Sequence, residues 1–196
     1  MSSRPLSIVG LAGSLRRSSF NRALLRAAVD LAPPGLALAA FDLIDVPLYN
    51  GDVEADGDPA SVVELKEAIA AADGVLFVTP EYNRGVPGVL KNAIDVGSRP
   101  YGSSVWNAKP AAIVSASPGA IGGFGANHQL RQACVFLNMP VMQQPEAYLG
   151  HVNDDSFDGD GCLKDGGLKD LVEKLAHALH DWVDMIHRSR AALAIH

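Results

Sequence analysis

The stretch "LSIVGLAGSLRRSSFNRALL", from Leu6 to Leu25, determines how the rest of the chain is interpreted. Its first part, Leu6–Ala12, is apolar except for Ser7 and predicts a buried β-strand. Apolar residues then recur at helical spacing from Ser19 to Ala32, where Pro33 stops the pattern, so a helix is expected there. Serines, arginines and one asparagine crowd the turn between the two. The stretch therefore predicts a strand-turn-helix unit with an unusually polar turn.

The same alternation of strand and helix continues along the chain. Strands are predicted over 6–12, 36–43, 74–79, 110–115 and, as a weaker pattern, 141–148. Helices are predicted over 19–32, 58–72, 87–94 and 126–138, and over a C-terminal segment with an apolar stripe formed by Leu168, Leu171, Leu175, Leu179, Trp182 and Ile186. Asp58 is expected to cap the second helix, with Pro59 at its first position. The segment 44–58 is predicted to be a loop.

These strands are apolar on both faces, which is typical of a parallel sheet covered by helices on both sides. Right-handed crossovers leave few topologies for five such strands. We therefore predict an α/β fold, a flavodoxin-like three-layer sandwich whose five-stranded parallel sheet has the order 2-1-3-4-5. Residues 1–196 are expected to form a single domain.

Composition excludes several classes of function. The 196 residues are 48% hydrophobic and 19% charged, as in a soluble globular protein. The net charge of −6 argues against nucleic-acid binding, and no apolar run is long enough to span a membrane. Two cysteines, Cys134 and Cys162, are too few for a disulfide framework, so we expect a reducing, cytoplasmic location. They cannot form a zinc site alone, and the histidines lack the spacing of metal ligands, so we expect no bound metal. Cys134 is expected to be a small core residue.

Three polar, glycine-rich segments each follow a predicted strand. They are "GSLRRSSFN" from Gly13, "PEYNRGVPG" from Pro80 and "SASPGAIGGFGANH" from Ser115. In a parallel sheet, every loop that follows a strand emerges at the carboxyl edge, where ligands bind near the switch point of the strand order. We therefore expect the three segments to form one ligand site.

The first segment has the chemistry of a phosphate site. The N-terminus of a helix offers free N–H groups and a partial positive charge, which favour an anion. Ser14, Ser19 and Asn21 can add side-chain donors, and Arg16 can add a charged contact. The alternative, a simple N-cap with solvated arginines, requires only one serine. Neither a P-loop nor a G-x-G-x-x-G string is present, so the pattern favours a mononucleotide with one terminal phosphate, FMN.

The second and third segments suit the ring of such a ligand. Pro80 ends a strand, and the backbone groups of Glu81, Tyr82 and Asn83 are expected to face a planar heterocycle. Ser117 can donate a hydrogen bond to the ring or to the ribityl chain. Tyr82 is equally consistent with a half-buried turn residue, and Trp106 with either the ligand mouth or a subunit contact.

These motifs carry a resemblance to a known family. "GSLRRSSFN", "VTPEYNRGVPGVLKNAIDVGSRP" and the "LRQ" and "PE" segments resemble the NAD(P)H-dependent FMN reductases, in particular the bacterial quinone and chromate reductases, from the first strand to about Gly150. The resemblance implies non-covalent FMN and homodimers that commonly pair into tetramers. It places the phosphate on Ser14, Arg16, Ser19, Phe20 and Asn21, and the ring on Pro80, Glu81, Tyr82 and Asn83, with Ser117 nearby.

Three positions depart from the family pattern. Ser18 replaces an expected glycine. Gly125 and His128 stand where such reductases can carry an arginine and a tyrosine that reach Glu146 across a tetramer contact. The resemblance therefore supports a dimer more strongly than a tetramer.

The resulting hypothesis is an enzyme that moves electrons from NADPH or NADH through FMN to quinones, azo compounds, chromate or similar small acceptors. The cofactor supplies the redox chemistry, so no side chain is assigned as catalytic. The alternatives are a flavodoxin-type electron carrier and a flavin-binding regulatory module, neither of which turns over a nicotinamide. The sequence leaves the acceptor and the choice between NADH and NADPH open.

Overall fold

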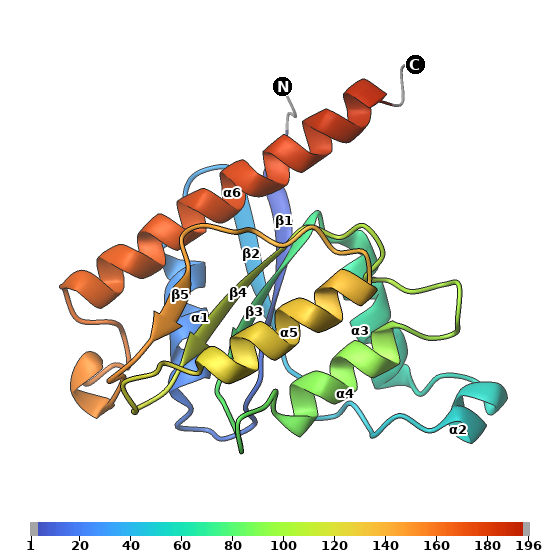
Figure 1. The fold of residues 1–196 in the computed structure, drawn as a ribbon, viewed down its shortest axis with the longest axis horizontal. Helices are drawn as coiled ribbons and strands as arrows, with labels where there is room; N and C mark the ends of the chain where they lie inside the picture. The colour runs from blue at the N-terminus through green and yellow to red at the C-terminus, as the bar shows by residue number, and fades with distance from the viewer. Residues whose placement is uncertain (1–3, 194–196) are drawn as a thin grey trace.

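A five-stranded parallel sheet forms the centre of the computed structural model, which describes residues 4–193 (Figure 1). Its strands are β1 (Leu6–Ala12), β2 (Leu36–Phe41), β3 (Gly74–Thr79), β4 (Ala111–Ala116) and β5 (Ala147–Leu149). They lie in the order β2-β1-β3-β4-β5, and every pair of neighbours is parallel. The predicted fold class and strand order are confirmed.

Helices cover both faces of the sheet (Figure 1). The helices are α1 (Phe20–Asp30), α2 (Gly51–Asp56), α3 (Ala60–Ala71), α4 (Gly88–Gly97), α5 (Phe124–Phe136) and α6 (Gly167–Leu193), with a short 3₁₀ turn over Asp154–Ser156. Alternate side chains of β3 point to opposite faces. Leu76 and Val78 join a core with α1 and α6, whereas Val75 and Phe77 join a core with α3, α4 and α5. Both faces of β3 are buried, which explains its uninterrupted apolar sequence.

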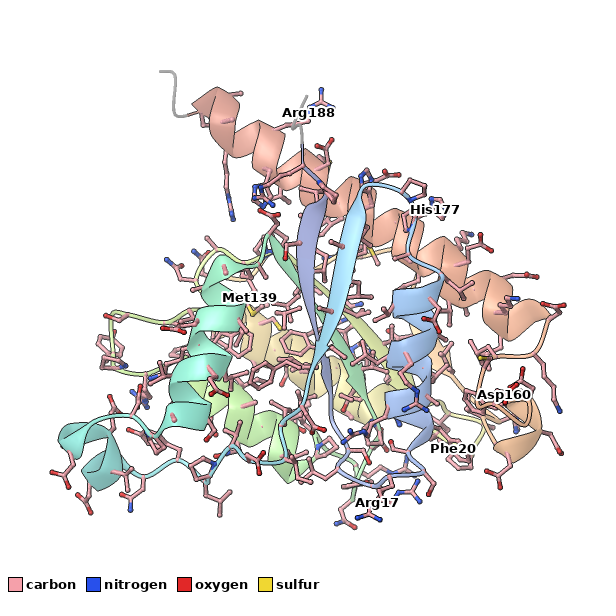
Figure 2. The ribbon with its side chains drawn as sticks, turned by 180° about the vertical axis from the view of Figure 1, so that it is seen from behind. Arg17, Phe20, Met139, Asp160, His177 and Arg188 are labelled. Atoms are coloured by element: carbon pink, nitrogen blue, oxygen red, sulfur yellow. The ribbon has the colours of Figure 1, made fainter. Side chains whose placement is uncertain are left out.

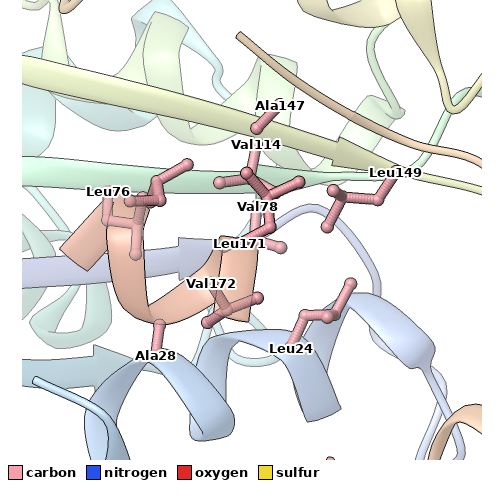
Figure 3. Close-up of a pocket in the computed structure, with 10 residues that line it drawn as sticks. Leu24, Ala28, Leu76, Val78, Val114, Ala147, Leu149, Leu171 and Val172 are labelled. Carbon is pink, nitrogen blue, oxygen red and sulfur yellow. The ribbon is translucent and has the colours of Figure 1, made fainter. Parts of the chain in front are cut away.

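The α1–α6 core contains a small cavity (Figure 3). Its volume of about 10 Å³ is barely that of one water molecule. Ten apolar residues line it: Leu24, Ala28, Leu76, Val78, Val114, Ala147, Leu149, Leu171, Val172 and Leu175. Because no polar atom faces the space, we interpret it as a packing gap rather than a ligand site.

Helix α6 crosses the sheet, and its last turns extend past the amino ends of β1 and β2 (Figure 1). Leu175 and Leu179 of the predicted apolar stripe are fully buried on its inner side, together with Val183, which the stripe did not include. Within residues 4–193, none of the helices is long and apolar enough to cross a bilayer.

The structure corrects three local predictions. The segment 44–58 contains helix α2, which begins where the Asn50 side chain accepts a hydrogen bond from the Asp52 N–H at 2.9 Å. Asp58 does not cap α3; Pro59 holds that position without a side-chain cap, and Asp58 pairs with Lys66 instead. The last strand is limited to Ala147–Leu149, because Pro145 has no N–H to contribute to a ladder; Val141 forms only an isolated bridge with Ala111.

Candidate functional site

Direct contacts tie the three carboxyl-edge segments together. The Gly13 N–H donates to the Val78 carbonyl at 2.9 Å, which fixes the first segment against β3. The Asn21 side-chain amide, in the first turn of α1, donates to the Ala116 carbonyl at the end of β4 at 3.3 Å. The Ala126 N–H, in α5, donates to the Glu81 carboxylate at 3.0 Å. The structure therefore brings the predicted phosphate and ring segments to one edge of the sheet.

The phosphate segment presents buried polar atoms that lack partners. Ser14, Ser19 and Asn21 are 3%, 3% and 4% exposed, although all three are polar. Ser19 caps α1, since its hydroxyl accepts from the Arg22 N–H at 3.4 Å. Among the described residues, neither Ser14 Oγ nor Asn21 Oδ1 has a hydrogen-bond partner. Buried polar atoms are nearly always satisfied in folded proteins, so these two atoms indicate a bound group that satisfies them.

The chemistry of these atoms fits a phosphorylated ligand with hydroxyl groups. The Ser14 hydroxyl can donate to a phosphate oxygen beside the free N–H groups of the first turn of α1. Asn21 Oδ1 is an acceptor and requires a donor such as a sugar or ribityl hydroxyl. Arg16 is exposed above this segment, and the Phe20 ring stacks on Phe157 with centroids 6.0 Å apart. The Phe20 ring is therefore already packed against another aromatic ring.

The "PEYN" segment forms a tight hairpin. Tyr82 and Gly85 exchange both backbone hydrogen bonds, at 3.1 and 3.0 Å. Asn83 and Arg84 have φ values of 51° and 64°, the positive pair that a type I′ turn requires. The turn uses the Tyr82 N–H, so this group is less available to a ligand than the sequence analysis expected. The Tyr82 side chain is 49% exposed, and Pro80 is buried under the hairpin.

The carboxylate of Glu81 has a role that sequence reasoning missed. Helix α5 begins after Gly123, which has no side chain to cap it. Glu81 Oε2 supplies that cap from the neighbouring loop by accepting from the Ala126 N–H, and Oε1 pairs with Arg84 at 3.3 Å. A Cβ on Gly125 would lie 2.8 Å from Glu81 Oε2. In the sequence, the signal for this role is that no capping side chain precedes α5, so the free N–H groups of its first turn need an acceptor from another segment.

Ser117 lies at the start of the third segment and is half-buried. Its hydroxyl donates to the Gly119 carbonyl at 3.1 Å, within its own loop. Gly122 and Gly123 follow with φ values of 63° and 76°, and a Cβ on Gly122 would lie 2.5 Å from the Tyr148 backbone. Gly122 is therefore required for the close packing of this loop on β5, and a Cβ on Gly123 would lie 3.0 Å from the Ser115 side chain in β4. Ser117 retains acceptor capacity, and donation to a ligand requires rotation of its hydroxyl.

Next to this loop lies an aromatic cluster, formed by Phe124, His128 and Tyr148, that the sequence did not predict. His128 Nε2 and Tyr148 Oη are 3.0 Å apart, and the Tyr148 hydroxyl donates to Glu146 Oε1 at 3.1 Å. The Phe124 ring lies 4.1 Å from the His128 ring. Burial, followed by the hydrogen bond to Glu146, raises the pKa of Tyr148. Glu146 thus has partners within its own chain despite the departures at positions 125 and 128.

Trp106 lies neither at the mouth of the ligand site nor at the surface, where a subunit contact would be. It is fully buried, its indole N–H donates to the Ile94 carbonyl at 2.9 Å, and its ring lies 5.8 Å from that of Phe77. Trp106 is therefore part of the core beneath α4.

Comparisons with known proteins show the family to which the chain belongs. Residues 6–154 match the family described as NADPH-dependent FMN reductase. A quinone reductase from Pseudomonas putida is 56% identical over 183 residues, which cover 93% of this chain and 97% of the relative. An NAD(P)H-dependent FMN reductase from Pseudomonas aeruginosa is 43% identical over 178 residues, covering 91% and 95%.

One solved structure is similar to this chain over nearly the whole length of both proteins. It is that of FerB, a flavoenzyme NAD(P)H:acceptor oxidoreductase from Paracoccus denitrificans, with a TM-score of 0.85 and 37% identity. The alignment covers 92% of this chain and 98% of FerB. A flavodoxin from Pseudomonas aeruginosa, at 15% identity and a TM-score of 0.56, shares the fold alone.

Proposed function

This chain belongs to the NADPH-dependent FMN reductase family, and from that membership we propose that it is an NAD(P)H-dependent oxidoreductase that uses FMN to reduce quinones. The proposal includes azo compounds and chromate as further acceptors. The pair of buried, unpartnered atoms Ser14 Oγ and Asn21 Oδ1 carries it, because these atoms lie where three loops meet at the sheet edge.

We assign the residues of the cofactor site as follows. The phosphate is held by the Ser14 and Ser19 hydroxyls, by Arg16, and by the backbone N–H groups of Phe20 and Asn21 at the N-terminus of α1. The loop of Pro80, Glu81, Tyr82 and Asn83 would hold the ring, with Ser117 nearby. Asn21 Oδ1 accepts from a hydroxyl of the ribityl chain.

When bound, FMN supplies the capacity to accept a hydride from a nicotinamide and to pass electrons on. The protein chain would hold the cofactor in place and provide the polar groups around it. The Glu81 cap fixes the "PEYN" loop against α5, so the free backbone groups of Glu81 and Asn83 keep a constant direction. Preorganised N–H groups of this kind stabilise negative charge that develops beside them. We assign no side chain as an acid or base in the reaction.

Assembly and location are further parts of the proposal. We propose one FMN-binding domain over residues 1–196 and a homodimer in the cytoplasm; the alternative is a tetramer formed by two such dimers. Large apolar side chains on the surface support self-association: Phe136 and Val135 at the end of α5 are 85% and 78% exposed, and Leu48 is 81% exposed.

An anaerobic titration tests this function. The purified protein is loaded with FMN, desalted and mixed with NADPH or NADH without oxygen, and the flavin absorbance is followed. We expect the flavin absorbance to decrease and to recover fully on addition of a quinone. Retention of FMN without reduction by either nucleotide would favour the electron carrier. Failure to retain FMN would refute the cofactor site itself.

A further inference from the structure

The aromatic cluster of Phe124, His128 and Tyr148 has no role in the cofactor site described above. It lies between the two loops that we assign to the ring. On one side, Glu81 of the "PEYN" loop caps the first turn of α5, which begins at Phe124. On the other side, Tyr148 packs against the glycine-rich loop, since a Cβ on Gly122 would lie 2.5 Å from the Tyr148 carbonyl carbon. A molecule that reaches the ring between these loops therefore has the cluster as a neighbour.

The cluster offers the surface that a planar acceptor needs. The Phe124 and His128 rings lie 4.1 Å apart, and the Phe124 and Tyr148 rings lie 5.1 Å apart. Phe124 is 47% exposed, and His128 is exposed as well. Exposed aromatic rings stack on planar apolar molecules, and the imidazole adds a polar group at the edge of that surface. This combination suits the ring and the carbonyl oxygens of a quinone.

A string of hydrogen bonds determines which nitrogen of His128 faces a partner. The Tyr148 hydroxyl donates to Glu146 Oε1 at 3.1 Å, because an ionised carboxylate can only accept. A hydroxyl has one hydrogen, so the Tyr148 oxygen must accept its second hydrogen bond, from His128 Nε2 at 3.0 Å. Nε2 therefore carries a proton. Nδ1 forms no hydrogen bond with any residue in the described range 4–193, so this nitrogen remains for a ligand.

Neighbouring groups keep this string in place. Burial, followed by the hydrogen bond to Glu146, raises the pKa of Tyr148, so the phenol keeps its hydrogen at neutral pH and can bridge the two partners. Arg131, on the next turn of α5, lies beside Tyr148 and donates to the Met142 carbonyl at 3.2 Å. This contact holds α5 against the segment before β5. The imidazole of His128 is therefore held between two elements that are themselves tied together.

Reduction of a quinone requires one proton that a hydride does not bring. The hydride brings both electrons and forms an O–H bond at one quinone oxygen. The ring electrons shift, the C=O double bond of the second oxygen becomes a single bond, and that oxygen carries a negative charge until it takes a second proton. The residues assigned above to the cofactor include no acid for this proton. An imidazole is the side chain that most often donates one near neutral pH.

We propose that Phe124, His128 and Tyr148 form the subsite of the quinone acceptor, and that His128 gives the second proton from Nδ1 to the quinone oxygen. The inference rests on the proposed function, which supplies the hydride. Phe124 stacks on the quinone ring, and Tyr148 and Glu146 are positioning residues that act through His128. Because the imidazole is exposed, it regains its proton from water, and the reaction balances over one turnover.

A comparison of two acceptors tests the role of the proton. Duroquinone takes two protons, and its four methyl groups prevent addition to the exposed thiol of Cys162. Ferricyanide takes electrons alone. We expect His128→Gln to lower kcat with duroquinone at least about tenfold, as loss of a general acid does, and to affect kcat with ferricyanide far less. Phe124→Ala should raise the KM for duroquinone more than it lowers kcat, because it removes a stacking surface and leaves the acid.

NMR of the FMN-loaded protein, labelled with ¹⁵N-histidine, gives a readout besides turnover. The ring signals of His128 are those that His128→Gln removes. We expect the neutral ring to carry its proton on Nε2, Tyr148→Phe to weaken that preference, and duroquinone to shift the His128 signals. The matched control is His177→Gln. Figure 2 shows His177 on α6, well away from Arg17 and Phe20 at the carboxyl edge, so its signals should not respond to duroquinone and its variant should turn over like the wild type.

The outcomes separate this inference from the proposed function. Equal losses of turnover with duroquinone and ferricyanide in His128→Gln would overturn the role of the proton, and so would unchanged turnover with duroquinone. Unmoved His128 signals up to the solubility limit of duroquinone would overturn the subsite. Decrease of the flavin absorbance with NADPH, measured without an acceptor, reports on the proposed function alone. If that decrease is absent, the NMR titration still decides whether the subsite binds a quinone.

Discussion

Ser14 is a buried serine whose hydroxyl has no partner among the described residues. Removal of a satisfied buried hydroxyl destabilises a protein, whereas removal of an unsatisfied one costs little. A substitution at Ser14 can therefore distinguish a role in ligand binding from a role in the stability of the fold. Asn21 differs, because its amide group is also bonded to the Ala116 carbonyl, so its replacement would alter both.

We predict that Ser14→Ala weakens FMN binding by a factor of about 10 to 100, the usual value of one hydrogen bond to a charged group. The free energy of unfolding of the apoprotein should change by less than about 0.5 kcal/mol. Fluorescence titration with FMN and urea unfolding measure the two quantities. Ser18→Ala, at an exposed position of the same loop, is the matched control. A loss of apoprotein stability without loss of FMN affinity would contradict the assignment.

Glu81 allows a second test at the residue scale. Glu81→Ala removes the acceptor that caps α5 and should destabilise the protein by about 1 kcal/mol, the typical value of an N-cap. Glu81→Gln keeps an amide oxygen in place and should cost less. Glu64→Ala, at an exposed position of α3, controls for the loss of a carboxylate. Equal midpoints of urea unfolding for Glu81→Ala and Glu64→Ala would show that the cap contributes nothing.

At the scale of the elements, the packing of α4 on the core depends on a missing side chain. A Cβ on Gly97 would lie 2.6 to 2.9 Å from the indole ring of Trp106, which is fully buried and bonded to the Ile94 carbonyl. The ring cannot move away without breaking that hydrogen bond. Gly97 therefore sets how closely the C-terminal end of α4 approaches the loop before β4.

We predict that Gly97→Ala destabilises the protein by about 1–3 kcal/mol, because it overpacks the core against a rigid ring. The matched control is Gly88→Ala at the start of the same helix, where an added Cβ meets no atom within 4 Å. That substitution should be neutral or stabilising by up to about 1 kcal/mol, the helix propensity of alanine over glycine. Thermal unfolding distinguishes the two; similar destabilisation by both would refute the packing argument.

At the scale of the whole molecule, the two thiols report on global unfolding. Cys134 is buried in the core with α3, α4 and α5, and burial raises the pKa of its thiol from 9.0 to about 12. Cys162 is exposed. Because the thiolate is the reactive form, Cys134 is inert in the native protein. We predict that one thiol reacts rapidly with Ellman's reagent and that the second reacts only at the rate of unfolding. Rapid reaction of both thiols would contradict this packing.

The raised pKa of Cys134 also makes stability depend on pH. The unfolded chain releases this proton near pH 9.0, whereas the folded chain retains it until about pH 12. The contribution of Cys134 is therefore fully present below pH 9 and is lost as the pH rises toward 12. Urea unfolding of the wild type between pH 8 and 11 should show this loss, and Cys134→Ala should show a shallower one. An identical pH dependence in the variant would exclude Cys134 as a source. Cys162→Ser is the control.

The sequence by itself determined the fold, the strand order and the meeting of the three loops. Apolar periodicity and the carboxyl-edge rule for parallel sheets are local or topological properties, so they can be inferred from the order of residues. Helix α2 was missed because a two-turn helix capped by Asn50 has no long apolar repeat. The fifth strand was predicted too long because its pattern contains Pro145, which cannot donate to a ladder.

Only the tertiary structure decided which partner each polar side chain meets. The Glu81 cap on α5 and the His128–Tyr148–Glu146 contacts both join residues from different elements. Their geometry depends on how those elements pack, and at Gly97 and Gly125 even one added Cβ would lie within 3 Å of a neighbouring side chain. Such distances depend on side-chain volumes on both sides of a contact, which no pattern along one segment records.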